Sequence, residues 1–289
     1  MKIIILIPIY NDWQSATKLL ENINNEVSEI DHTFSIILVN DASTEQFTEN
    51  FSNLSNLNSI EVINLKNNVG HTRCIATGLK HINENQQFDY IIPMDGDGED
   101  RPEEIKLFVE NFNYHPNKTI VGERVKRSEN ILFKMCYSFH KILTYTFTGQ
   151  SIKFGNYTCL TKSTIEKMLS DKATWSSFSG SLAKNCNDKA TISSERGKRY
   201  FGPSKMSFLN LIKHSLAIIG VFKFSVLVRS ILFVLVYMFL IYQKITFIMI
   251  LPVIFTVIFL ISTFIISQRG SLDEMNNSLS NILIIDKII

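Results

Sequence analysis

The sequence lacks several patterns that would identify its chemistry at once. Its four cysteines lie far apart with no CxxC pair, which is unlike a zinc site or a disulfide framework and is typical of reduced thiols in the cytosol. Neither a Rossmann G-x-G-x-x-G nor a Walker P-loop is present. A net charge of +2 gives no field that would favour nucleic acid, and no internal repeat or low-complexity run appears. Nucleic acid is therefore excluded from the expected partners.

Apolar runs and amphipathic segments alternate along the first 125 residues. Apolar runs bounded by turn residues are predicted as buried strands, at residues 2–9, 34–39, 60–65, 90–94 and 119–121. The segments between the runs carry apolar residues at helical spacing. Strands that alternate with helices at these lengths indicate βαβ units, so we expect an α/β fold with a Rossmann-like, mostly parallel sheet.

The fourth predicted strand ends in a run of acids. Asp95 and Asp97 flank Gly96 directly after this strand. Ligands of open α/β sheets gather at the carboxyl ends of strands. Two carboxylates at this spacing can reach one hard cation, such as Mg²⁺ or Mn²⁺. Taken alone, the run fits a solvated acidic turn as well as it fits a metal site, and only the neighbouring motifs distinguish the two.

Two further acids, Asp12 and Asp41, follow the first and second predicted strands. An acid after the second strand suits a hydrogen bond to a ribose or a base edge. Because the phosphate-cradling loops are absent, a bound diphosphate would need a metal, which Asp95 and Asp97 can hold. Arg73 opens a later helix and is predicted to add a positive charge near the phosphates, with a plain surface position as the alternative.

Several motifs in this order resemble family 2 glycosyltransferases of the GT-A fold. They read PIYND, LVNDAS, NNVGHTRCIATGLKH, MDGDGEDRPEEI and VGER, and they cover roughly residues 2–125. The later RGKRYFGPSKMSFLNLIKHSL, followed by an apolar hairpin, is similar to the membrane-anchored branch that includes dolichyl-phosphate mannose synthases and bacterial polyprenyl-phosphate glycosyltransferases. The combination is far more specific than any single motif.

The resemblance implies roles for named residues. The nucleotide would be lined by Pro8, Tyr10, Asp12 and Asp41, with Arg73 added from the argument above. The metal and the diphosphate would be handled by Asp95 and Asp97. The predicted catalytic residues are Asp97, Arg124, which matches the arginine of the branch's GSR pattern, and Asn156. The lipid phosphate would be held by Arg199, Ser204 and Lys205, which match an arginine-then-SK motif, and by Arg127 nearby.

Two positions depart from the pattern of that branch. Glu99 stands where the branch usually has Gln, and Asn156 stands where it often has Asp. An asparagine carbonyl is a weak cation ligand and cannot act as a base, which affects the geometry expected at the acceptor.

The charges favour a phosphate as the acceptor. A hydroxyl acceptor needs a general base, whereas a phosphate is already anionic and needs cations around it. The only acidic residues in the segment 156–187 are Glu166 and Asp171, and both are placed like acids on the surface of a helix. Cations gather near the expected membrane edge instead, at Arg124, Lys126, Arg127, Arg196, Lys198, Arg199 and Lys205. Plain positive-inside topology is the alternative explanation for this set.

Two apolar stretches, residues 224–242 and 245–266, each approach the length of about 20 residues that crosses a bilayer. The excess of Lys and Arg before the pair places the connecting turn outside and both flanks in the cytoplasm. The expected division is a GT-A domain at 1–203, a juxtamembrane amphipathic helix at 204–223, two membrane helices at 224–266 and a cytoplasmic tail of unassigned role at 267–289. Residues 131–147 are expected to form a core-facing helix, with a membrane-interface helix as the alternative.

The sequence thus predicts a metal-dependent, inverting hexosyltransferase of the bacterial inner membrane with its catalytic domain in the cytoplasm. It would move a sugar from a UDP- or GDP-sugar to a polyprenyl phosphate for envelope glycan assembly. One alternative is a hydroxyl acceptor with Glu123 or Asp188 as base; another is a degenerate nucleotide-sugar-binding module, suggested by Glu99 and Asn156. The partners are the donor, the lipid, the bilayer and a separate flippase, and a homo-oligomer is left open.

Overall fold

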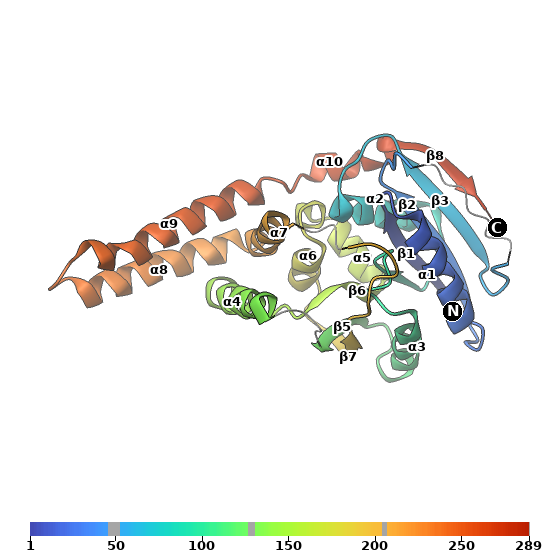
Figure 1. Ribbon diagram of the computed structural model, residues 1–289, viewed down its shortest axis with the longest axis horizontal. Helices are drawn as coiled ribbons and strands as arrows, with labels where there is room; N and C mark the ends of the chain where they lie inside the picture. The colour runs from blue at the N-terminus through green and yellow to red at the C-terminus, as the bar shows by residue number, and fades with distance from the viewer. Residues whose placement is uncertain (46–52, 127–130, 204–206, 289) are drawn as a thin grey trace.

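A single mixed sheet of eight strands organises the chain, in the order β7-β5-β6-β4-β1-β2-β3-β8 (Figure 1). The computed structural model describes residues 1–45, 53–126, 131–203 and 207–288. The strands are β1 Lys2–Ile9, β2 Thr33–Asn40, β3 Ser59–Leu65, β4 Tyr90–Pro93, β5 Thr119–Lys126, β6 Phe154–Thr161, β7 Lys189–Glu195 and β8 Ile282–Lys287. The central pairs β4–β1, β1–β2 and β2–β3 are parallel, whereas β6 and β8 pair antiparallel with their neighbours. The predicted α/β fold with a mostly parallel sheet is confirmed.

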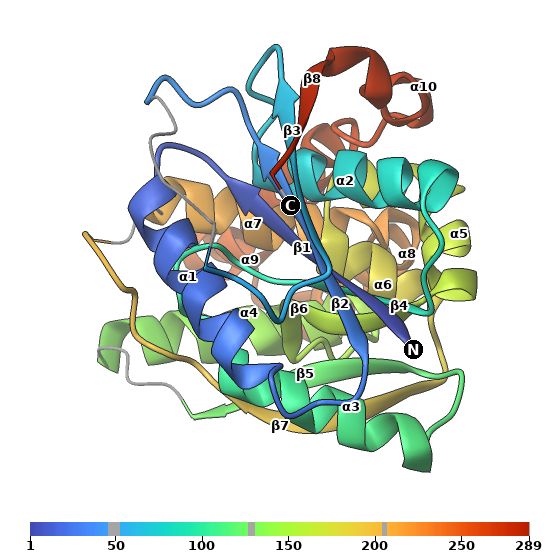
Figure 2. The same ribbon diagram turned by 90° about the vertical axis from the view of Figure 1, so that its right-hand side faces the viewer.

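Helices cover both faces of the sheet because its central strands are apolar on both sides. Alternate residues of β1 pack into different cores, with Ile5 in one and Leu6 in the other. The first core is closed by α1 (Trp13–Glu26) and α3 (Ile105–Tyr114), and the second by α2 (His71–Asn85), α5 (Lys162–Leu169) and α6 (Phe178–Asn185). Figure 2 shows α1 on one side of the strands and α2 with α5 on the other.

Two long apolar helices project from this domain as a hairpin (Figure 1). They are α8 (Lys223–Ile241) and α9 (Phe247–Ser267), and both are long and apolar enough to cross a membrane. Only 11% of the most apolar window of each helix is buried, which is unlike the core helix of a soluble protein. A membrane-spanning hairpin therefore accounts for these helices better than a buried pair does.

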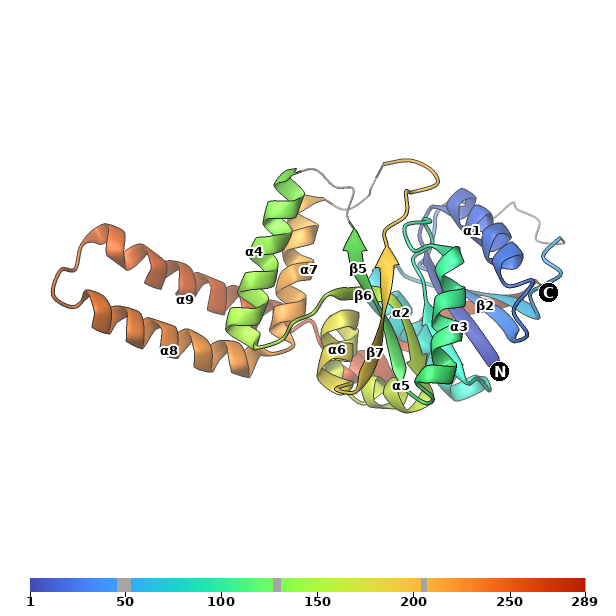
Figure 3. The same ribbon diagram turned by 90° about the horizontal axis from the view of Figure 1, so that it is seen from below.

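Two further helices, α4 (Ile131–Thr148) and α7 (Phe208–Gly220), lie side by side at the base of the hairpin (Figure 3). On α4, the side chains of Phe139, Ile142 and Tyr145 are exposed at a spacing of three residues. The prediction that this helix faces the core is therefore wrong for these three positions. Exposed aromatic and apolar side chains next to a membrane hairpin fit the interface alternative.

The segment after the hairpin returns to the sheet instead of forming a detached tail. Helix α10 (Leu272–Asn276) is followed by β8, which pairs antiparallel with β3 at the sheet edge. Met275 is buried against Ala76 and Trp175. Both ends of the hairpin are thus fastened to the same domain, a feature that the sequence did not reveal.

Candidate functional site

The acidic turn after β4 lies beside the carboxyl end of β1, as the parallel pairing of these strands requires. A Cβ at Gly96 would lie 3.2 Å from the carbonyl oxygen of Pro8, a tight contact that glycine avoids. Gly98 has φ +87°, and a Cβ there would lie 2.5 Å from the ring of Tyr200. The two glycines allow the turn to pack closely against β1 and against residues 196–200.

Asp95 is held by three neighbouring groups. His71 Nε2 lies 3.0 Å from Asp95 Oδ1, and Asn156 Nδ2 donates to the same oxygen at 3.3 Å. The backbone N–H of Asp95 donates to Asp100 Oδ2 at 2.9 Å. Burial alone would raise the pKa of Asp95, but the nearby charges of His71 and Arg124 lower it overall. Asp95 is therefore ionised at neutral pH.

Asp100 anchors the predicted catalytic arginine. Arg124 Nη2 donates to Asp100 Oδ1 at 3.1 Å, and the Asp100 side chain is only 2% exposed. Burial and the negative charge of Asp95 raise the pKa of Asp100 to about 7, against the opposing charge of Arg124. Asp100 and His71 were not predicted as site residues, although both lie within the motifs quoted above.

Asp97 binds an arginine from the membrane-proximal part of the chain. Arg199 Nη1 donates to Asp97 Oδ2 at 2.5 Å, and Arg199 Nη2 donates to Asp12 Oδ2 at 2.7 Å. Burial and the charge of Asp95 raise the pKa of Asp97 to about 6 despite Arg199. Among the described residues, Arg199 Nε is buried without a hydrogen-bond partner. The guanidinium thus bridges carboxylates at the ends of β1 and β4.

Residues 196–200 lie along the acidic turn and hold it from outside. The N–H of Gly197 donates to the carbonyl of Glu99 at 2.8 Å, and that of Tyr200 donates to the carbonyl of Asp97 at 3.0 Å. Glu99 forms an ion pair with Arg196. A glutamine at position 99 could not form this ion pair. The glutamate that stands there in place of the branch's usual glutamine therefore has Arg196 as its ionic partner.

The charges of this cluster suit a divalent cation. Five carboxylates come together with three guanidinium groups, from Asp12, Asp95, Asp97, Glu99, Asp100, Arg124, Arg196 and Arg199. The carboxylates outnumber these guanidinium groups and the imidazole of His71 together by one, and oxygen ligands are those that Mg²⁺ and Mn²⁺ prefer. Within the described residues no group of three His, Cys, Asp or Glu side chains is placed to hold a metal. The predicted pair of Asp95 and Asp97 therefore fits a cation that takes its other ligands from phosphates and water.

Arg73 contacts the C-terminal segment and Trp175, and its predicted place near the phosphates stays a prediction. Its guanidinium donates to the carbonyl of Arg269 at 3.2 Å, lies 3.4 Å from Glu274 and stacks over the ring of Trp175. Arg73 follows His71 by two positions, and residues two apart on a helix lie on nearly opposite faces. Because His71 faces Asp95, Arg73 must point toward the C-terminal segment.

Asp41 and two residues at the end of the first strand are predicted to line a nucleotide, and the structure shows their surroundings. Both carboxylate oxygens of Asp41 accept bonds from the loop before α2, from Val69 N at 2.7 Å and Gly70 N at 2.9 Å. Asp41 is only 3% exposed, so it shapes this loop, and its predicted contact with a nucleotide stays a prediction. Pro8 is buried in β1, whereas Tyr10 directly after the strand is 45% exposed.

The remaining predicted residues fall into two groups. Asn156 and Arg199 join the cluster, as given above. Three of the predicted acceptor-phosphate residues, Arg127, Ser204 and Lys205, lie outside the described residues.

Comparison with known proteins identifies relatives of the chain. Residues 4–172 match the model of the family described as "Glycosyl transferase family 2". Undecaprenyl-phosphate 4-deoxy-4-formamido-L-arabinose transferase of Photorhabdus laumondii is 29% identical over 219 residues, covering 73% of this chain and 65% of that protein. Its Proteus mirabilis counterpart is 28% identical over 221 residues, covering 73% and 64%. The chain thus spans just under two thirds of the length of these relatives.

A solved structure shares the fold. Glucosyl-3-phosphoglycerate synthase from Mycobacterium tuberculosis, crystallised with Mn²⁺, UDP and phosphoglyceric acid, superposes with a TM-score of 0.55. The two are 12% identical, and the match covers 78% of each chain. At this identity the likeness shows the fold alone.

Proposed function

Since the chain belongs to glycosyl transferase family 2, we propose that it transfers one sugar from a nucleotide-sugar donor to a polyprenyl phosphate at the membrane surface. One observation carries this proposal: the carboxylate cluster is contacted by the two segments that adjoin the base of the membrane hairpin. Asn156 follows α4 by a short loop, and Arg199 precedes α7. A lipid phosphate that stays in the bilayer could reach a donor bound at this position. The relatives named for undecaprenyl phosphate support the same acceptor class.

The donor would bind at the carboxyl ends of β1 and β4. Asp95 and Asp97 would hold Mg²⁺ or Mn²⁺, which supplies Lewis-acid stabilisation of charge on the departing diphosphate. His71 and Asn156 keep Asp95 oriented for this contact, and Tyr10 presents its exposed ring to the nucleotide. Arg124, anchored by Asp100, adds a positive charge beside the cluster.

The acceptor phosphate needs no general base because it is already anionic at neutral pH. A phosphate oxygen would form a bond with the anomeric carbon of the sugar. The bond from that carbon to the diphosphate oxygen would break, and its electron pair would leave with the nucleoside diphosphate. Attack opposite the leaving group inverts the anomeric configuration, as the family resemblance implies. Arg124 and Arg199 lie where they could neutralise the phosphates during this exchange.

The contacts of Glu123 and Asp188 disfavour a hydroxyl acceptor. Glu123 forms an ion pair with Lys153 at 2.9 Å, and Asp188 forms one with Lys118 at 2.8 Å. Neither acid joins the carboxylate cluster, so neither is placed as the general base that a hydroxyl requires. The degenerate-module alternative is disfavoured too, because Asp95 and Asp97 are retained and Glu99 is paired with Arg196.

We further propose that the catalytic domain is cytoplasmic and that the hairpin anchors it in a bacterial inner membrane, where the product serves envelope glycan assembly. The lysines and arginines before α8 support this orientation through the positive-inside rule. Two helices leave little surface within the membrane for moving a lipid across, so a separate flippase would translocate the product. A homo-oligomer is left open.

The test is transfer by the detergent-solubilised chain. Labelled UDP- and GDP-sugars, including a nucleotide-linked 4-deoxy-4-formamido-L-arabinose, are incubated with Mg²⁺ or Mn²⁺, with and without undecaprenyl phosphate. We expect label in the organic phase only with metal and lipid, lost in Asp97→Asn and kept in Asp31→Asn, which changes an exposed carboxylate elsewhere. Donor binding with no lipid-linked product from any sugar would overturn the proposal.

A further inference from the structure

A row of hydrogen bonds runs from the strand that follows the hairpin to the loop after β2. Asp286 Oδ2 of β8 accepts from Asn64 Nδ2 of β3 at 2.8 Å. Asn64 Oδ1 accepts from Asn40 Nδ2 at the end of β2, also at 2.8 Å. Asn40 Oδ1 in turn accepts from the backbone N–H of Ser43 at 2.9 Å. We call Ser43, Asn40, Asn64 and Asp286 the amide row.

The two ends of the amide row fix the direction of every bond in it. The backbone N–H of Ser43 can only donate, and an ionised carboxylate at Asp286 can only accept. Each asparagine amide between these ends therefore turns its oxygen toward Ser43 and its nitrogen toward Asp286. Asn40 lies directly opposite Asn64 in the parallel pair β2–β3, which keeps the two amides within reach. A donor at position 286 would reverse both amides and take the oxygen of Asn40 away from Ser43.

The turn that the amide row holds contains a strained residue. Ala42 has φ +55°, in the left-handed region that a side chain disfavours. Such residues persist where surrounding contacts fix them, and they gather at ligand sites. Asn40 fixes this one twice, since its carbonyl accepts from the N–H of Ala42 at 2.9 Å and its side chain accepts from that of Ser43. Asp41 lies in the same turn, so the turn sets the position of an acid predicted to contact the nucleotide.

The same turn is joined to the end of β1. Ser43 Oγ accepts from the N–H of Asn11 at 2.9 Å, and Asn11 Oδ1 accepts from the N–H of Thr44 at 2.8 Å. Asn11 stands between Tyr10 and Asp12, two of the residues predicted to line the nucleotide. A shift of Ser43 is therefore passed to the end of β1, where the donor is proposed to bind.

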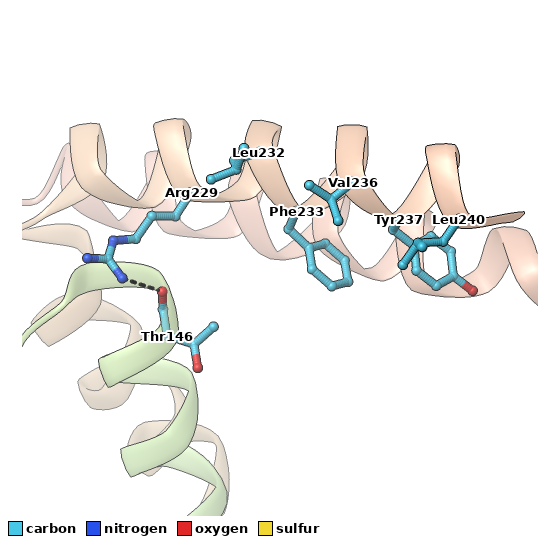
Figure 4. Close-up of a pocket in the computed structure, with 7 residues that line it drawn as sticks. All are labelled: Thr146, Arg229, Leu232, Phe233, Val236, Tyr237 and Leu240. Atoms are coloured by element: carbon cyan, nitrogen blue, oxygen red, sulfur yellow. Dashed lines mark hydrogen bonds between the residues drawn. The ribbon is translucent and has the colours of Figure 1, made fainter.

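A groove on α8 is a poor alternative place for the nucleotide. It has a volume of about 340 Å³ and lies where the carboxyl end of α4 meets α8 (Figure 4). Its charged side chain, Arg229, donates to the carbonyl of Thr146 at 3.0 Å. The rest of its lining is mostly apolar and consists of Leu232, Phe233, Val236, Tyr237 and Leu240. A base and a ribose need several placed polar groups, which the strand ends offer.

We propose that Asp286 and Asn64 are positioning residues for the donor nucleotide and act through Asn40 on the turn at residues 41–44. This inference rests on the donor half of the proposed function: it needs a nucleotide at the ends of β1 and β2 and no particular acceptor. The strand β8 then does more than cover the edge of the sheet. The segment that returns from the hairpin completes the support of the nucleotide loop.

Substitutions at position 286 test the direction of the amide row. The probes are UDP and GDP, whose Kd values with Mn²⁺ are measured by isothermal titration calorimetry on the detergent-solubilised chain. For the nucleotide that the unmodified chain prefers, we expect Asp286→Lys to raise the Kd about fivefold, which corresponds to about 1 kcal/mol. Asp286→Asn should bind like the unmodified chain, because its amide oxygen can accept the same bond.

Leu283→Lys is the matched control for the added charge. It places a lysine on the same strand at a position that is 66% exposed and outside the amide row, so the Kd should not change. An unchanged Kd in Asp286→Lys would overturn the proposal. An equal loss of affinity in Leu283→Lys or in Asp286→Asn would overturn it too, because neither substitution reverses the row.

A second substitution should rebuild the row in the opposite direction. When Asn40→Asp is added to Asp286→Lys, the lysine can donate to Asn64 Oδ1 and Asn64 Nδ2 can donate to the new carboxylate at position 40, which still accepts from Ser43. We expect the double substitution to bring the Kd back to within about twofold of the unmodified chain. General damage to β8 would not be repaired from β2, so a failure to regain affinity would overturn the proposal.

Transfer kinetics separate this proposal from the proposed function. Asp286→Lys should raise the donor KM about fivefold and leave kcat and the KM for undecaprenyl phosphate unchanged. A loss confined to kcat would overturn the positioning role. Nucleotide binding that follows the expected pattern without any lipid-linked product would refute the proposed acceptor and support the amide row. An unmodified chain that binds neither UDP nor GDP would overturn both proposals.

Discussion

Arg199 donates a hydrogen bond to Asp97 at 2.5 Å although the two residues are 102 positions apart. Asp97 belongs to the acidic turn after β4, and Arg199 belongs to the segment that leads into helix α7. This ion pair therefore joins the proposed donor side of the site to the part of the chain that approaches the membrane. In our proposal a divalent cation at Asp97 would share that carboxylate with the guanidinium.

Arg199→Gln is expected to raise the affinity for Mn²⁺ several-fold while lowering transfer. Removing the guanidinium removes a positive charge that repels the metal at Asp97, but it also removes a cation near the phosphates. The affinity is read by electron paramagnetic resonance during Mn²⁺ titration without substrates. Arg101→Gln is the matched control, since Arg101 pairs with Glu103 and Glu195. Unchanged Mn²⁺ affinity in Arg199→Gln would contradict the proposal that the cation and the guanidinium share the carboxylate of Asp97.

Asp171 gives a stability difference that depends on pH. Its Oδ2 lies 2.7 Å from Lys184 Nζ, and its Oδ1 accepts from the N–H of Ala173 at 3.0 Å. Burial alone would raise the pKa of Asp171, but these partners lower it overall. Because the pKa of Asp171 is lower in the folded chain than its value of about 3.9 in the unfolded chain, the ionised carboxylate stabilises the folded chain at pH values above about 3.9. This stabilisation is lost as the pH falls through the folded pKa.

Asp171→Asn should therefore cost about 1 kcal/mol at neutral pH, and this cost should shrink as the pH falls through the folded pKa. The readout is the apparent Tm of the detergent-solubilised chain at several pH values, with both chains scanned at the same rate. Asp188→Asn serves as control, because the Asp188 side chain is 77% exposed in its pair with Lys118. A deficit of Asp171→Asn that persists unchanged at acidic pH would show that the ion pair is not its cause.

Arg73→Ala is expected to lower stability and leave the donor KM unchanged. The guanidinium stacks over Trp175 at 5.2 Å and pairs with Glu274, which itself accepts from Trp175 Nε1 at 2.7 Å. These contacts fasten α10 to α2, and their loss should cost about 1–2 kcal/mol. Thermal unfolding and donor kinetics are measured on the same preparation. A higher donor KM with an unchanged Tm would restore the phosphate role that the sequence suggested.

Local patterns were enough to predict the strands and the acids at their ends, since the apolar runs of β1 to β4 are each bounded by turn residues. Asp95 and Asp97 could be named from the sequence because they follow a strand directly. His71 was not predicted as a site residue, and Arg73, which was, contacts Trp175 and Glu274 instead of Asp95, because helix phase depends on where α2 begins against the sheet. Arg199 could be named from its motif, but its partner Asp97 depends on how residues 196–200 cross the turn. The strand β8 was missed because its partner β3 lies more than 200 residues earlier in the sequence.

The pairing of β8 with β3 predicts the topology of the hairpin. Since β8 follows α9 and joins the domain that precedes α8, both ends of the hairpin must lie on one side of the membrane. A membrane-impermeant maleimide applied to spheroplasts should label Gln243→Cys, in the turn between the helices, without permeabilisation. Asp273→Cys, at the start of α10, should be labelled only after the membrane is opened. The unmodified chain controls for its own cysteines. Labelling of position 273 in intact spheroplasts would place the domain outside and contradict the proposed cytoplasmic site.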